Sequence, residues 1–190
     1  LALRVFYRMK ENQGNARTNA ILFPVYVFLA LFSKGPIGIL VPLLSITVYL
    51  FAVGRIKEFG RYWGWTTWGI LLVCCAVWFG AVYAEGGEAY LNNLLFHQTI
   101  DRAVDAFHHK APFYYYLVSV WYSIAPWSLF AISVIILALV RKKGISDLQK
   151  LFLSVIVTTF VMLSCISSKL QVYLLPAFPF IVYCAALYIP

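Results

Sequence analysis

The sequence predicts an all-α integral membrane protein, a single domain over residues 1–190 with about six apolar helices. The chain is 63% hydrophobic and only 12% charged, with a mean hydropathy of +0.83, whereas soluble domains are about half apolar and a quarter charged. Long uncharged runs alternate with short basic segments. The net charge of +8 is therefore assigned to membrane topology and anionic lipids, with no nucleic-acid partner.

The N-terminal segment, residues 1–19, is polar and basic and is expected to be an interfacial helix or loop. The next apolar run, 20–32, contains Pro24. A spanning helix needs about 20 residues, so this run must extend into its neighbours, thin the bilayer or end below the surface. Gly35 and Pro36 then predict a tight turn into a second span over 37–53.

Four further apolar stretches follow a basic turn at 54–62. Residues 63–83 are uncharged, with aromatic residues at both ends, and predict a clear spanning helix. Residues 113–140 form an uncharged run longer than a bilayer needs, which predicts a tilted helix or an aromatic start in the interface. Residues 151–168 and 170–190 predict a second short hairpin.

The basic residues predict the orientation. Segments 1–19, 54–62 and 141–150 lie on one side if the spans alternate, and they hold 11 of the 15 basic residues. The positive-inside rule places them in the cytoplasm. The polar loop, residues 85–112, then faces a periplasm-like compartment. Four cations on that outer side are not explained by topology: Lys34, Arg102, Lys110 and Lys169.

The polar loop contains all three histidines and four of the seven acidic residues. Its periodicity predicts a helix from about Glu88 to His109, with one apolar and one polar face. His97, Asp101 and Asp105 lie four residues apart on the polar face. They are either a solvated face of a helix lying on the membrane or two to three ligands of a divalent metal.

Lys34 and Lys169 each lie in a tight turn between apolar runs. A lysine at membrane depth costs about 2.5–3.5 kcal/mol unless it reaches the headgroups or an anion. Either these lysines extend to the outer headgroups or they form the floor of an outward cavity that binds phosphate. Tyr173, one turn from Lys169, suits the second interpretation. The four cysteines lie in apolar runs without metal-type spacing and are expected to be reduced and structural.

Five motifs occur in order along the chain: SKGPIGIL, FHQTIDR, HKAPFYYY, APW and SSKLQVYLLPAFP. Together they resemble the bacterial aminoarabinose transferases of lipid A and the wider family related to protein O-mannosyltransferases. These are glycosyltransferases of the GT-C type in the bacterial cytoplasmic membrane. The resemblance covers nearly the whole chain and implies many transmembrane helices with periplasmic interfacial helices.

The resemblance also implies an activity: transfer of a sugar from a polyprenyl-phosphate carrier to a lipid or protein acceptor on the periplasmic face. His97 resembles a loop histidine associated with a divalent metal. Arg102, Lys169 and Tyr173 resemble residues that contact the carrier phosphate, and Lys34 matches a recurrent lysine. The family's catalytic carboxylate precedes all these motifs. The chain is therefore expected to be a fragment without the catalytic base and inactive alone.

Physical reasoning supports the same chemistry, because fixed cations in a water-poor cavity stabilise the phosphate that leaves the anomeric carbon. Two other functions stay open. A transporter or flippase of a lipid-linked anion would use the same cations along a pathway, although no ionisable residue lies in mid-span. A structural subunit would have no site, and the polar loop would only lie on the bilayer.

Overall fold

The computed structural model describes residues 1–93, 111–123, 125, 127–140, 144–166, 169 and 171–188. The chain divides into two compact units, Leu1–Leu43 with Arg55–Asp105 (unit 1) and Leu44–Gly54 with Ala106–Pro190 (unit 2). Within the described residues every regular element is a helix and none is a strand. The predicted all-α class is confirmed for this part of the chain.

Unit 1 begins with α1 (Ala2–Lys10), which packs against α2 (Ala16–Lys34). Helix α1 is amphipathic and buries Phe6 on its apolar side. The side chain of Asn15 caps α2 by accepting a hydrogen bond from the backbone N–H of Arg17 at 2.9 Å. At about 1.5 Å per residue α2 is about 28 Å long. The short apolar run therefore extends into its polar N-terminal neighbours, the first of the three predicted solutions.

The predicted tight turn after α2 is also found. Gly35 adopts a φ of 65°, and α3 (Ile37–Ala52) begins two residues later. A Cβ at Gly38 would overlap the carbonyl group of Ala30, so the start of α3 lies directly against the end of α2. With 16 residues α3 is shorter than a span of about 20 residues.

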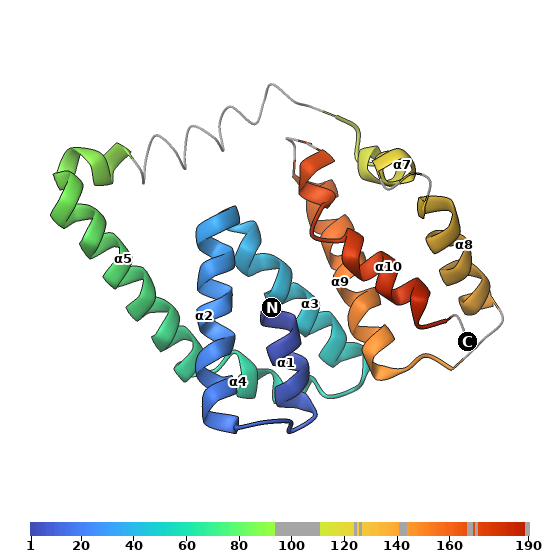
Figure 1. Cartoon of the computed structure of the whole chain (residues 1–190), viewed down its shortest axis with the longest axis horizontal. Helices are drawn as coiled ribbons and strands as arrows, with labels where there is room; N and C mark the ends of the chain where they lie inside the picture. Colours follow the sequence, from blue (N-terminus) through green and yellow to red (C-terminus); the bar gives the residue numbers. More distant parts are fainter. Residues whose placement is uncertain are drawn as a thin grey trace. The chain divides into compact units, whose positions relative to one another are not determined.

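The rest of unit 1 comprises η1 (Ile56–Glu58), α4 (Phe59–Tyr62) and α5 (Trp65–Asn92). Helix α5 contacts α2, and in Figure 1 the two helices lie together at their lower ends and diverge toward the top. Edge-to-face ring pairs line this contact, with centroids 5.3 Å apart for Phe23–Trp63 and 4.2 Å apart for Phe32–Trp78. The helix predicted over 63–83 is found as α5, which is long and apolar enough to cross a membrane and continues to Asn92.

Gly87 interrupts α5 with a φ of 67° and a ψ of −175°. Only glycine adopts this backbone region readily. The residues after it, Glu88 to Asn92, are helical again, so the structure agrees with the helix predicted to start at about Glu88. The remainder of that prediction, residues 94–110, lies outside the described residues.

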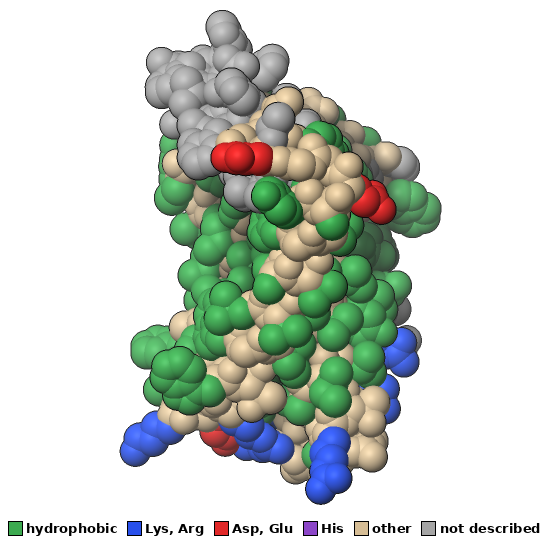
Figure 2. Space-filling model, turned by 90° about the vertical axis from the view of Figure 1, so that its left-hand side faces the viewer, with side chains coloured by type: hydrophobic (Ala, Val, Ile, Leu, Met, Phe, Trp, Pro, Cys, Tyr) green, Lys and Arg blue, Asp and Glu red, His purple; other side chains and the backbone are tan. Residues whose placement is uncertain are grey.

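Among the described residues, three stretches are long and apolar enough to cross a membrane: Ala16–Lys34, Ile56–Glu88 and Asp147–Cys165. Large apolar side chains of α5 are exposed, for example Leu72 and Val77 at 68% each. Figure 2 shows this hydrophobic face, with Lys and Arg side chains gathered at its lower end. An exposed apolar face of this length is typical of helices that face lipid.

In unit 2 the uncharged run 113–140 is divided, and a single tilted helix is not found. Helix α7 (Tyr115–Ser123) and helix α8 (Trp127–Val140) form a pair bent by 117°. The sequence gives the reason, because Pro126 has no N–H to continue the hydrogen-bonding of α7. If the bent pair counts as one span, the described part of the chain has four candidate spans, fewer than the six predicted apolar helices.

Helix α9 (Asp147–Cys165) begins with a reciprocal capping box between Ser146 and Gln149. Helix α10 (Phe178–Ala186) packs between α9 and α8, so the predicted pairing of the last two apolar segments is found. The connection is longer than the predicted tight turn, because it includes the 3₁₀ helix η4 (Gln171–Leu174).

Candidate functional site

Lys169 lies at the C-terminal end of α9 and is only 6% exposed. Its Nζ donates hydrogen bonds to the backbone carbonyls of Ser164, at 2.9 Å, and Ile166, at 2.6 Å. The last carbonyls of a helix have no partner within the helix and carry the negative end of its dipole. The ammonium group therefore caps α9, which explains how a lysine can be buried at this position.

An aromatic ring also lies close to this ammonium group. Lys169 Nζ lies 5.9 Å from the ring centroid of Tyr116, a distance at which a cation is attracted to the ring face. Tyr116 is fully buried on α7. From the sequence, the aromatic start of this run was assigned to the membrane interface, and Tyr173 was the tyrosine noted one turn from Lys169.

Tyr173 itself lies in η4 and is half-buried. Within the described part of the chain it makes no hydrogen bond to Lys169. The neighbouring Gln171 instead joins η4 to α7, because its Nε2 donates to the hydroxyl of Tyr122 at 2.9 Å. These two pairs, Lys169 with Tyr116 and Gln171 with Tyr122, join the α9–α10 connection to α7 and are together named the polar cluster.

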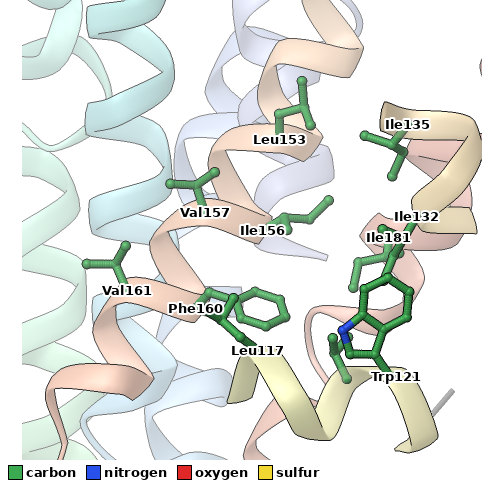
Figure 3. A pocket seen from close by; sticks show the side chains of 11 residues that line it. Leu117, Trp121, Ile132, Ile135, Leu153, Ile156, Val157, Phe160, Val161 and Ile181 are labelled. Atoms are coloured by element: carbon green, nitrogen blue, oxygen red, sulfur yellow. The ribbon is translucent and has the colours of Figure 1, made fainter. Parts of the chain in front are cut away.

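An apolar cavity of about 560 Å³ lies in the same unit, between α7, α8, α9 and α10 (Figure 3). Its volume is within the range of small-molecule sites, about 300–1,000 Å³. The only heteroatom on its lining side chains is the indole nitrogen of Trp121. The lining residues are Leu117, Val120, Trp121, Ile132, Ile135, Leu153, Ile156, Val157, Phe160, Val161 and Ile181.

The cavity and the polar cluster share α7 as a wall. Val120 lines the cavity, and Tyr116 lies one turn earlier on the same buried side of α7. Val157 and Val161 line the cavity and are still 53% and 55% exposed, so it opens to the outside of the unit. This arrangement suits an amphiphile with an apolar chain and an anionic head.

The other predicted site residues are not part of this cluster as described. Lys34 is the last residue of α2, is exposed and belongs to unit 1. Arg102 and His97 lie outside the described residues, as do the other two histidines. Within the described residues no group of three His, Cys, Asp or Glu side chains is arranged to hold a metal. The predicted divalent metal at His97 stays a prediction.

Sequence reasoning missed Tyr116, Tyr122 and Gln171. A signal for the first two was present, since three consecutive tyrosines and Tyr122 follow a proline in an otherwise apolar run.

Comparison with protein-family models, with curated proteins and with solved structures gives no match. Function is therefore inferred from the residues of the chain itself.

Proposed function

We propose that the chain is part of a GT-C-type membrane glycosyltransferase. The enzyme moves a sugar from a polyprenyl-phosphate carrier to a lipid, such as lipid A, or to a protein acceptor on the periplasmic face of the bacterial cytoplasmic membrane. The observation that supports this most is the buried ammonium group of Lys169 beside an apolar cavity that opens outward. A carrier lipid has the matching chemistry, because it joins a long apolar chain to a phosphate.

In this proposal the isoprenoid chain occupies the cavity and the phosphate lies near Lys169. An ammonium group has three N–H donors, and the carbonyls of Ser164 and Ile166 occupy two of them. The third makes no hydrogen bond among the described residues, and in this proposal it donates to a phosphate oxygen. Arg102, Tyr173 and Lys34 are proposed to add donors to the same phosphate.

These donors would act when the sugar leaves the carrier. Negative charge develops on the phosphate in the transition state, and fixed cations in a site with little water stabilise it. A divalent metal associated with His97 would add positive charge to the same region. The carboxylate base that activates the acceptor hydroxyl is proposed to lie outside this chain.

The test uses the protein that contains this chain, expressed in bacterial membranes. Lys169→Ala and Arg102→Ala should each abolish sugar transfer, measured as the loss of the mass increment on lipid A or on membrane proteins. Lys150→Ala is the matched control, because Lys150 is paired with Asp147 at the other end of α9. Membrane insertion should be equal in all variants. Full transfer by both site variants would refute the proposal.

A second candidate is a transporter or flippase of the same lipid-linked anion. The 117° bend between α7 and α8 favours it, since interrupted helices are common around transporter sites. Movement of a labelled lipid-linked sugar across liposomes that contain the purified protein, without any glycosylated product, would identify the transporter.

A further inference from the structure

A small pocket at the basic end of unit 1 lies between α1, the start of α2 and α4. Its volume is about 70 Å³, compared with about 30 Å³ for one water molecule in the liquid. It thus has space for a phosphate-sized group. Arg8 of α1 and Arg61 of α4 line it, and no carboxylate does. We propose that this pocket binds a phosphate group, in the first place that of an anionic lipid headgroup.

The first reason is charge. Two guanidinium groups that line one small pocket repel each other unless an anion lies between them. In the described part of the chain neither Arg8 nor Arg61 pairs with a carboxylate. The two nearest acids in the sequence have other partners, because Glu11 pairs with Lys10 at 2.8 Å and Glu58 pairs with Arg55 at 2.6 Å. The pocket therefore keeps an unbalanced positive charge.

The second reason is that the pocket is already organised. Arg61 Nη2 donates to Asn12 Oδ1 at 2.9 Å, which fixes the guanidinium plane and leaves four of its five N–H donors. Asn19 Nδ2 donates to the carbonyl of Gln13 at 2.8 Å and holds the loop before α2. A fixed, planar guanidinium matches the geometry of phosphate oxygens.

Gly14 makes this arrangement sterically possible. It has a φ of 76°, and a Cβ placed there would lie 2.7 Å from Arg8 Nη2. Any larger residue would therefore displace the Arg8 guanidinium. Gly54 has a similar φ of 71° with nothing within 4 Å of its added Cβ. It provides a control with the same backbone strain and no steric effect on a neighbour.

The surroundings favour a lipid as the source of the phosphate. Residues 1–19 and 55–62 contain seven basic and two acidic residues, and they adjoin the exposed apolar faces of α2 and α5. In Figure 2 the Lys and Arg side chains lie at the border of that apolar face. Such a border is where lipid phosphates lie. The pocket is at the N-terminal end of α2, whereas Lys34 is at its other end, so it is separate from the carrier site proposed above.

The experiment measures binding by native mass spectrometry, with the purified protein containing this chain in neutral detergent. The probe is dioctanoyl phosphatidic acid, and separate arms add inorganic phosphate or dioctanoylglycerol. Arg8→Gln and Arg61→Gln should each lower the affinity for one phosphatidic acid molecule by about tenfold. Gly14→Ala should do the same. Arg4→Gln, an exposed arginine on α1 outside the pocket, and Gly54→Ala should bind like the unaltered protein.

Each outcome is informative. Competition by inorganic phosphate at equal concentration would support a phosphate site and assign it to the free ion, whereas competition by dioctanoylglycerol would overturn the proposal. Equal losses in Arg4→Gln and Arg8→Gln would overturn it as well, because general charge attraction would then suffice. Lys169→Met should keep this binding, so failure here is distinguishable from failure of the proposed glycosyltransferase function.

Discussion

The hydroxyl oxygens of Ser45 and Thr158 lie 2.7 Å apart and join α3 to α9 within unit 2. The Thr158 hydroxyl donates to the carbonyl of Ser154, also at 2.7 Å, so Ser45 donates to Thr158. Both side chains are buried. Polar contacts of this kind hold helices together in lipid. Lipid tails are as apolar as the helix surfaces, so the hydrophobic effect does not drive the helices to associate.

Ser45→Ala and Thr158→Val should therefore each lower the free energy of unfolding, and the double variant should lose less than the sum. Pairs of this kind in membrane proteins couple by about 0.6 kcal/mol on average, with a maximum near 1.7. The measurement is unfolding in mixed detergent micelles, followed by helix content in circular dichroism. Additive losses would mean that the two hydroxyls do not interact.

Thr159 is the matched control for this pair. It neighbours Thr158 and is also buried, but its hydroxyl has no hydrogen-bond partner among the described residues. A buried hydroxyl without a partner opposes folding. Thr159→Val should thus leave the free energy of unfolding unchanged or raise it, in contrast to Thr158→Val.

Lys169→Met should destabilise the protein by about 1–3 kcal/mol, because it leaves carbonyls at the end of α9 without a donor. The same unfolding measurement applies. Lys34→Met is the comparison, since Lys34 is exposed at the end of α2, and its effect should stay within about 0.5 kcal/mol. If the two lysine variants are equally stable, Lys169 is not the cap of α9.

Gly87→Ala should straighten α5, because alanine does not adopt the backbone angles of Gly87 without a cost of about 1–3 kcal/mol. Spin labels at Val77 and Asn92 report this change by pulsed electron resonance, after the native cysteines have been replaced. A straight helix separates these backbone positions by about 22 Å, and the bent one separates them by less. Gly80→Ala, in the regular part of α5 with open space around it, should not alter the distance.

Val157→Trp should fill part of the apolar cavity from its open side and weaken binding of undecaprenyl phosphate by about tenfold. Binding of inorganic phosphate should not change, because the polar cluster around Lys169 is left intact. Val182→Trp is the control, since Val182 is exposed on α10 and does not line the cavity. If the two tryptophan variants bind undecaprenyl phosphate equally well, the carrier lipid does not occupy the cavity.

Local signals in the sequence were sufficient for several elements. Gly35 with Pro36 located the turn between α2 and α3, and the uncharged run 63–83 located α5. Glycine, proline and charged residues affect the backbone only within a few residues, so their effects can be predicted without knowing the tertiary structure. The division of 113–140 had such a signal in Pro126, but the length of the run was interpreted as tilt instead.

The surroundings of Lys169 were only partly predictable. That a lysine in this turn must find oxygen partners followed from the cost of burying its charge. The partners that the structure describes are carbonyls of α9 and the ring of Tyr116, and the phosphate with Tyr173 beside it stays a prediction. Tyr116 is distant in sequence, and its role depends on how α7 packs against η4, which no local pattern encodes.

The contact between Gly38 and Ala30 has a consequence for Lys34. Since a single additional carbon at residue 38 would collide with main-chain atoms of α2, the two helices must separate if any other residue occupies that position. Gly38, an uncharged residue four positions after Lys34, thus determines the direction in which the ammonium group of Lys34 points. Among natural variants of the protein, position 38 should therefore accept fewer residue types than position 34.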